Sequence, residues 1–291
     1  MKAIFYNLLA WVILPVMDGL AKYLSVDLPV LQIVWARYFF TVVITLSFII
    51  IFFRKQLVWT SKPKLQLFRG LILLCANMLF FYAISIISLT KALTLAFVAP
   101  LIVTALSPFI LGEIVGYRRW LAVIIGFIGS LIVIRPGLIE FNVATLAALG
   151  TGFFYGIYLI ITRKLHTADS PLLTLLITGV VGAIILSVYM PFGWIEPSPN
   201  QWLFLFCIGL CASVGHFFLI LSLKYADASK LAPFSYFELV TNVIIGYYFF
   251  SDFPDIWTWV GLLIIINSGF YIFIRERSRV VNVPFKGPWE L

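Results

Sequence analysis

The chain has 291 residues, of which 63% are hydrophobic and 11% are charged, and its mean hydropathy is +1.08. This composition excludes an ordinary soluble domain, in which charged residues make up about a quarter of the chain. The net charge is +8, but the basic residues lie in short connections between apolar segments, so the charge predicts no nucleic-acid partner.

Ten apolar segments follow one another along the chain, and each is long enough to cross a bilayer. The first begins close to Met1 and lacks a cleavage site of small residues, so we expect a retained helix rather than a signal peptide. Long apolar runs also differ from the alternating pattern of a membrane β-barrel. The sequence predicts an all-α polytopic membrane protein with ten transmembrane helices, at approximately 4–24, 30–53, 66–87, 92–112, 118–135, 142–162, 171–190, 200–223, 231–250 and 256–274.

The basic residues predict how these helices are oriented. With the amino terminus in the cytoplasm, 16 of the 20 basic residues fall in cytoplasmic segments, whereas Lys22, Lys91 and Arg135 fall on the outer side. Cytoplasmic loops of membrane proteins carry such an excess of Lys and Arg. We therefore expect a bacterial-type inner membrane protein with both termini in the cytoplasm and cytoplasmic loops at 54–65, 113–118, 163–169 and 224–230.

The first two segments each contain a charged residue within the apolar run. An ionised side chain at the bilayer centre costs about 2.5–3.5 kcal/mol on insertion scales, so it usually faces a cavity or a partner. Asp18 has Lys22 four residues on, on the same helical face, and Arg37 is an alternative partner. We expect Lys22 and Arg37 to act in structure or gating, and Asp18 either in such a pair or in substrate binding. Trp11 shares the face of Asp18 and is a candidate binding residue.

The fourth and sixth segments add a proline and several aromatic rings. Pro100 has no N–H and leaves the carbonyl of Ala96 without its usual donor, and free carbonyls near the midplane are common ligands in transporters. Pro100, Phe97, Phe154 and Tyr158 are candidate binding residues, because aromatic faces attract organic cations and stack on heteroaromatic rings. For each ring, packing in the core is an equally good interpretation.

The eighth and ninth segments contain two further ionisable residues. Glu238 has no basic residue within one turn on its own helix, so we expect its carboxylate to meet a proton or a cationic substrate. The alternative is a neutral structural acid. Tyr236 is a candidate binding residue, and His216 is expected to act in structure or gating. Cys207 and Cys211 share a helix face, but without further ligands they predict packing rather than a metal site.

The chain also resembles itself across its two halves. The stretch at 116–136 is similar to that at 254–276, with Trp120 and Trp259 139 positions apart. Two copies of five helices must have opposite orientations in the membrane, and inverted repeats around a central site are a recurrent design of secondary transporters. We therefore expect two inverted five-helix repeats at 1–137 and 138–275, followed by a cytoplasmic tail at 276–291.

Several short stretches carry a resemblance to a known family. They are Asp18-Gly-Leu-Ala-Lys22, Gln32-Ile-Val-Trp-Ala-Arg37, Tyr236-Phe-Glu238-Leu-Val and the run from Phe250 to Arg275-Glu276. The whole chain resembles the drug/metabolite transporter superfamily of the EamA type, and especially its branch of S-adenosylmethionine and riboflavin uptake carriers. The resemblance implies that helices 1–4 and 6–9 enclose a central cavity while helices 5 and 10 lie outside it. It does not determine the substrate, because close relatives carry different cargoes.

These features favour a secondary transporter for a small organic metabolite. The sequence has no Gly-x-Ser-x-Gly or His-Glu-x-x-His motif and no ATP-binding loop, so we expect neither an enzyme nor a cofactor. The favoured cargo is cationic or zwitterionic, like S-adenosylmethionine, with Asp18 and Glu238 for its positive charge and Arg37 for a carboxylate. Riboflavin, which is neutral and planar, is the alternative cargo, and an amino acid or an amine is a further alternative. A channel, a lipid scramblase or an intramembrane enzyme is the alternative class, and proton coupling and a homodimer stay open.

Overall fold

The structure is built from helices. The computed structural model describes residues 2–53, 60–134 and 142–251, together with 256–257, 259–261, 263–264, 267–268 and 271, and none of these lies in a strand. The helices are α1 (Lys2–Leu24), α2 (Val30–Phe52), α3 (Pro63–Ile86), α4 (Leu89–Ala96), α5 (Ala99–Ile110), α6 (Tyr117–Ile134), α7 (Val143–Lys164), α8 (Pro171–Ser187), η2 (Met190–Phe192), α9 (Pro199–Tyr225), α10 (Ala228–Leu231), η3 (Ala232–Tyr236) and α11 (Phe237–Phe250).

Seven helical stretches in the described residues are long and apolar enough to cross a membrane. They are Lys2–Leu24, Val30–Phe52, Pro63–Ile86, Leu89–Ile110, Val143–Lys164, Pro171–Phe192 and Pro199–Tyr225. Large apolar side chains such as Phe5, Phe48 and Ile51 are exposed on the outside, as expected of helices that face lipid. The prediction of an all-α multi-pass protein is therefore confirmed, whereas the count of ten helices stays a prediction.

Short polar caps explain where several helices begin. The side chains of Ser88, Asn142, Ser170 and Ser198 each accept a hydrogen bond from a backbone N–H in the first turn of α4, α7, α8 and α9, respectively. The Gln201 side chain completes a capping box by accepting from the N–H of Ser198. These local signals made the starts of the helices predictable from sequence.

The sequence predicted one continuous helix at 92–112 and another at 231–250. Both predictions were wrong in continuity, because each segment is divided. The first is split into α4 and α5 after Ala96, and the second is split into α10, η3 and α11. Pro100 and Pro233 cannot donate to the preceding turn, so an unbroken helix loses a hydrogen bond at each site. A second cause is close packing: the carbonyl oxygen of Ala96 lies directly against Gly152 of α7, where a Cβ has no room.

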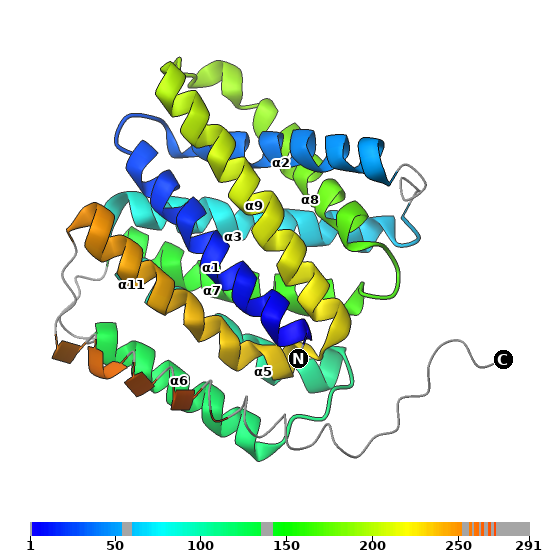
Figure 1. Cartoon of the computed structure of the whole chain (residues 1–291), viewed down its shortest axis with the longest axis vertical. Coiled ribbons are helices and arrows are strands. Elements are labelled where there is room, and N and C mark those ends of the chain that lie inside the picture. The colour runs from blue at the N-terminus through cyan, green and yellow to red at the C-terminus, as the bar shows by residue number, and fades with distance from the viewer. Residues whose placement is uncertain are drawn as a thin grey trace.

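The packing of the helices brings distant parts of the chain together. Figure 1 shows α1 running beside α9 and α11, and α3 similarly packs along α7. Helix α2 packs against α8 and α9, while α3 also contacts α8. Helices α4 and α5 both pack against α7, and η3 and α11 both pack against α1. Each of these contacts recurs when the helices of the first half are exchanged with those of the second half. For example, the contact of α1 with α9 corresponds to that of α7 with α3, and the contact of α2 with α9 corresponds to that of α8 with α3.

Two pairs of helix boundaries in the two halves are separated by the same number of residues as well. The residues that precede α4 and α10, Ser88 and Asp227, are 139 positions apart, and so are Phe97 and Tyr236 at the two helix breaks. The rings of Phe97 and Tyr236 pack edge to face with centroids 5.2 Å apart. The two breaks therefore meet inside the molecule.

The connections fall into two groups, one at each end of the helices. At one end, Asp169 accepts hydrogen bonds from Thr60 and Gln66, and Arg163 contacts Glu113 and Asp227. At the other end, the Gln32 side chain bonds the backbone of Ile195, and Gln201 donates to Asp27. The first end holds the connections that the sequence predicts to be cytoplasmic.

Candidate functional site

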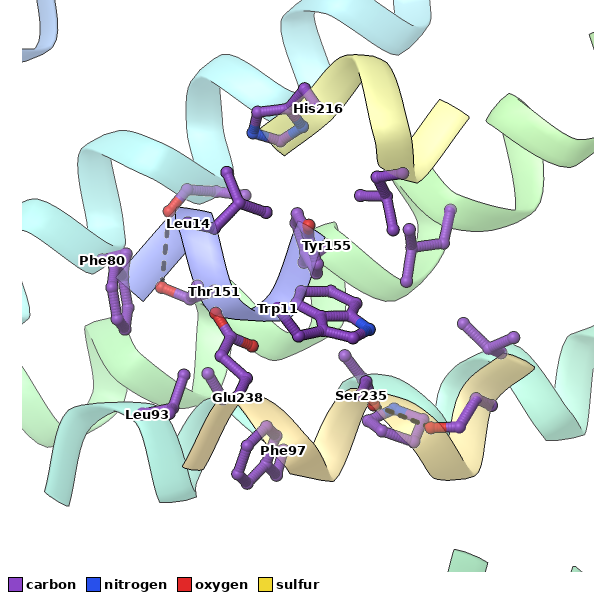
Figure 2. Close-up of a pocket in the computed structure, with 18 of the residues that line it drawn as sticks. Trp11, Leu14, Phe80, Leu93, Phe97, Thr151, Tyr155, His216, Ser235 and Glu238 are labelled. Carbon is purple, nitrogen blue, oxygen red and sulfur yellow. Dashed lines mark hydrogen bonds between the residues drawn. The ribbon is translucent and has the colours of Figure 1, made fainter. Parts of the chain in front are cut away.

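A cavity of about 80 Å³ lies where the two halves of the chain meet. Its polar and aromatic lining comes from α1 (Asn7, Trp11, Asp18), α3 (Asn77, Phe80), α4 and α5 (Phe97, Pro100), α7 (Thr151, Tyr155), α9 (His216), η3 (Ser235) and α11 (Glu238). Figure 2 shows ten of its lining side chains labelled, with Glu238 between Thr151 and Trp11 in this view. None of the described side chains of helix α6 lines the cavity, and the position of helix 5 outside the cavity stays a prediction.

Two carboxylates, Asp18 and Glu238, face this cavity. Asp18 is 3% exposed and Glu238 is half-buried. Within the described part of the chain, neither carboxylate forms an ion pair or a side-chain hydrogen bond. Buried acids without partners are costly in a membrane protein, and they mark substrate or ion pathways.

The basic residues considered as partners of Asp18 contact other groups. The ammonium of Lys22 donates to the carbonyls of Ile84 and Ile87 at 2.8 and 2.9 Å, at the end of α3. The expected ion pair between Asp18 and Lys22 is therefore wrong, and Lys22 instead satisfies carbonyls at a helix terminus.

Arg37 is likewise not clamped to Asp18 by a direct bond. Its Nη2 contacts the Nε2 of His216 at 2.7 Å, its Nε lies 3.3 Å from the sulfur of Met17, and its guanidinium stacks 4.6 Å from the ring centre of Tyr38. Arg37 is 2% exposed and does not line the cavity. The contact of Arg37 with a cargo carboxylate therefore stays a prediction, which this conformation, with Arg37 outside the lining, does not display.

Two neighbouring side chains, one at each ring nitrogen, determine where the proton of the neutral His216 ring lies. Arginine does not lose its proton in proteins, so the Nε2 facing Arg37 must accept and the proton of His216 must sit on Nδ1. This Nδ1 lies 3.3 Å from the hydroxyl of Tyr158, which also accepts from Nη2 of Arg69 at 3.2 Å. His216 thus faces the cavity with both ring nitrogens already bonded, and its structural or gating role stays a prediction.

The predicted aromatic residues and Pro100 divide into two groups. Trp11, Phe97 and Pro100 line the cavity as expected. Tyr158 is fully buried behind His216, and Tyr236 packs on α6 and donates to the carbonyl of Val123 at 3.0 Å.

Phe154 is also absent from the lining, because it packs against Phe153. Its neighbour Tyr155 takes the place in the cavity and meets the Trp11 ring edge to face. One step along an α-helix turns a side chain by about 100°, so the wrong residue of this adjacent pair was chosen.

Hydrogen atoms on the uncharged polar groups of the cavity are largely committed to the protein. The Asn77 amide nitrogen donates to Tyr38 and Leu73, and the hydroxyl of Ser235 donates to the carbonyl of Ala232. The Thr151 hydroxyl donates within α7 to the carbonyl of Ala147. These three groups keep only lone pairs for a ligand, so they present acceptors to the cavity.

Three charged residues and a serine bond the backbone beside one end of the cavity, and this set is here called the mouth cluster: Glu113, Arg163, Asp227 and Ser229. Arg163 donates to the carbonyl of Leu223 at 2.7 Å and to Asp227 at 3.1 Å, and its Nε lies 3.6 Å from Glu113. Glu113 accepts from the backbone N–H groups of Ala228 and Ser229 at 2.9 and 3.0 Å. Leu223 and Ala228 themselves line the cavity, so the mouth cluster joins its two edges.

Sequence reasoning missed Asn77, Thr151, Tyr155 and Arg69. Asn77 stands alone in an apolar run, and the argument applied to Glu238 would have found it had amides been included. Arg69 was assigned to a cytoplasmic segment, yet it is fully buried and donates to Thr162, Thr178 and the carbonyl of Thr174. Its position inside the predicted apolar segment at 66–87 was the available signal.

A cavity with unpaired acids, enclosed by helices that cross the membrane, defines a multi-pass transporter. The profile of the EamA-like transporter family matches residues 1–135 and again residues 142–274. The chain therefore belongs to the EamA-like transporter family.

Curated relatives and a solved structure extend along nearly the whole chain. An S-adenosylmethionine uptake transporter of Rickettsia prowazekii is 31% identical over 279 residues, 96% of this chain and 94% of the relative. A riboflavin transporter of Vibrio cholerae is 27% identical over 283 residues, 96% and 95% of the two chains. A crystal structure with 15% identity covers 96% of this chain and 98% of its own, with a TM-score of 0.76, and supports the fold alone.

Proposed function

We propose that this protein carries a small organic molecule with a positive charge across a bacterial inner membrane, and that S-adenosylmethionine is the favoured cargo. One observation carries the proposal: the described lining contains two carboxylates without partners and no lysine or arginine. A cation entering between Asp18 and Glu238 supplies the missing counter-charge. Trp11 and Tyr155 add aromatic faces, which attract onium groups.

The relatives support this choice without deciding it. S-adenosylmethionine combines a permanent sulfonium charge, an amino group and a heteroaromatic ring, which suit acids, acceptors and aromatic faces. Riboflavin is the second candidate, because a relative of similar coverage is a riboflavin transporter and because a planar neutral ring fits the aromatic lining. For riboflavin the acids would serve as proton sites instead.

Transport by alternating access is the mechanism that we infer. The cavity of about 80 Å³ holds a few water molecules but no nucleoside, so the surrounding helices must separate to admit cargo. Two inverted five-helix repeats at 1–137 and 138–275 would allow such rocking. Support comes from the two family matches, the exchange symmetry of the helix contacts and the boundaries repeated 139 positions apart.

Counterflow into liposomes tests the function. Purified protein is reconstituted with unlabelled S-adenosylmethionine inside, and radiolabelled S-adenosylmethionine is added outside. We expect saturable uptake that exceeds that of empty liposomes and of liposomes loaded with buffer. Flux that does not saturate would indicate a channel or scramblase, conversion of the label to a new compound would indicate an enzyme, and competition by riboflavin alone would favour the second cargo.

A further inference from the structure

One wall of the cavity combines a flat ring with acceptors whose hydrogen-bonding directions are determined. It consists of Asn77 and Phe80 on α3 and Thr151 on α7, here called the α3–α7 wall. In Figure 2, Phe80 and Thr151 lie on one side of Glu238, and Trp11 and Tyr155 lie on the other. The wall is thus separate from the aromatic pair beside the acids.

The orientation of the Asn77 amide follows from its partners. Its Nδ2 lies 2.8 Å from the carbonyl oxygen of Leu73 and 2.8 Å from the hydroxyl of Tyr38. A carbonyl only accepts, so the amide nitrogen must face Leu73, and the amide oxygen must be the group that remains. The Oδ1 of Asn77 has no hydrogen-bond partner among the described residues. Because the residue lines the cavity, this acceptor is available to a ligand.

Thr151 adds a second acceptor next to the first. Its hydroxyl lies 2.9 Å from the carbonyl of Ala147 and 3.4 Å from that of Ala76, and it has one hydrogen to donate to them. The contact with Ala76 places Thr151 beside the residue that precedes Asn77. Phe80 follows Asn77 by three residues, so its ring lies on the same face of α3.

We propose that the α3–α7 wall is a subsite for the heteroaromatic ring of the cargo, and that it selects a ring carrying an amino group. The ring stacks on Phe80, and its amino group donates to Asn77 and Thr151. The inference rests on the proposed function, since it assumes a cargo whose cationic centre occupies the space between Asp18 and Glu238. If the ring carried an oxo group instead, its oxygen would face the acceptor oxygens of Asn77 and Thr151. None of these three oxygens could donate, so buried polar groups would stay unpaired.

A comparison of two cargoes tests the subsite. Competition binding to purified protein compares S-adenosylmethionine with S-inosylmethionine, its analogue with an oxo group in place of the ring amino group. We expect the parent protein to prefer the amino form by about tenfold or more, because a site built around hydrogen bonds rejects an analogue that cannot form them. Asn77→Leu should reduce this preference to about threefold or less, whereas Asn242→Leu, a buried amide outside the cavity lining, should retain it.

Thr151→Val keeps the shape of the side chain and removes its hydroxyl. It provides the test of the subsite if Asn77→Leu does not fold. We expect it to lower the preference by about threefold, the effect of losing one neutral hydrogen bond. The inference is overturned if folded variants retain the parental preference, or if the parent binds both cargoes equally well. If the parent binds neither cargo, the proposed function fails instead of the subsite.

Discussion

At the scale of single residues, we propose that Asp18 and Glu238 recognise the positive charge of the cargo. Both face the cavity, and neither has a partner among the described residues. The cost of leaving these acids unpaired within the membrane is offset when a cation binds between them. Their role in binding is a prediction that the structure makes geometrically reasonable.

Replacing each acid by its amide measures that role. Glu238→Gln and Asp18→Asn preserve shape and delete charge, so each should weaken binding of S-adenosylmethionine by about tenfold or more, the range for a hydrogen-bonded charge. Isothermal titration across a series of pH values provides the measurement, with Glu196→Gln in a surface loop as the control. Affinities equal to that of the parent at every pH, for both folded variants, would exclude the acids as charge partners.

Arg37 acts on the fold rather than on the cargo. Its guanidinium bonds His216 and stacks on Tyr38 outside the cavity lining. Arg37→Leu leaves the Nε2 of His216 as a buried acceptor without a donor, which costs about 1–3 kcal/mol. We expect a lower thermal unfolding temperature in detergent and an affinity for cargo close to that of the parent. A stable Arg37→Leu protein that binds one cargo normally and another not at all would contradict this assignment.

At the scale of elements, the mouth cluster connects four separate parts of the fold. Arg163 at the end of α7 bonds the end of α9, and Glu113 after α5 bonds the start of α10. Burial acts to raise the pKa of Asp227, but the hydrogen bond and charge of Lys230 and the charge of Arg163 outweigh it and lower this pKa below 3.8. Asp227 therefore stays ionised as pH falls, and its ion pairs persist until the pH approaches that lowered pKa.

Opening of this end can be followed by cysteine labelling. In a variant without native cysteines, Ser235→Cys places a thiol in the cavity lining. Adding Glu113→Gln should raise its rate of reaction with a water-soluble maleimide by about fivefold, since a change of about 1 kcal/mol shifts an equilibrium by that factor. Lys164→Gln removes an exposed charge at the same end, outside the mouth cluster, and should change the rate by less than about twofold. Equal rates with and without Glu113→Gln would show that the mouth cluster does not limit access.

At the scale of the whole molecule, orientation in the membrane is still a prediction. The connections around Lys62, Glu113, Arg163 and Asp227 gather at one end of the helices, and the distribution of basic residues predicts that this end is cytoplasmic. The opposite end carries the region around Glu196.

Labelling of intact cells tests the orientation. Single cysteines near Lys91 and Glu196 should react with an impermeant reagent added outside, whereas a cysteine near Lys62 should react only after the membrane is broken. The opposite pattern would reverse the topology and place the mouth cluster on the outer side. Labelling of all three sites from outside would contradict the predicted helix count.

The spans and their ends were largely predictable from the sequence, because hydropathy, caps and prolines act within one segment. The helix breaks at Phe97 and Tyr236 were not, although Pro100 and Pro233 marked them. A proline in a membrane helix permits a bend or a break, and the choice depends on what packs against it. Here Gly152 makes room for the displaced carbonyl of Ala96.

The sequence by itself determined that the protein is helical and crosses the membrane, and it identified Asp18, Glu238, Trp11, Phe97 and Pro100, all of which line the cavity. Only the tertiary structure decided which neighbouring side chains join them: Tyr155 lines the cavity, whereas Phe154, Tyr158, Tyr236 and Arg37 do not. The sequence records that a segment is apolar and where a charge interrupts it. The rotation of each helix about its axis is set by packing against segments far away in the chain, and that rotation determines which side chains face the cavity.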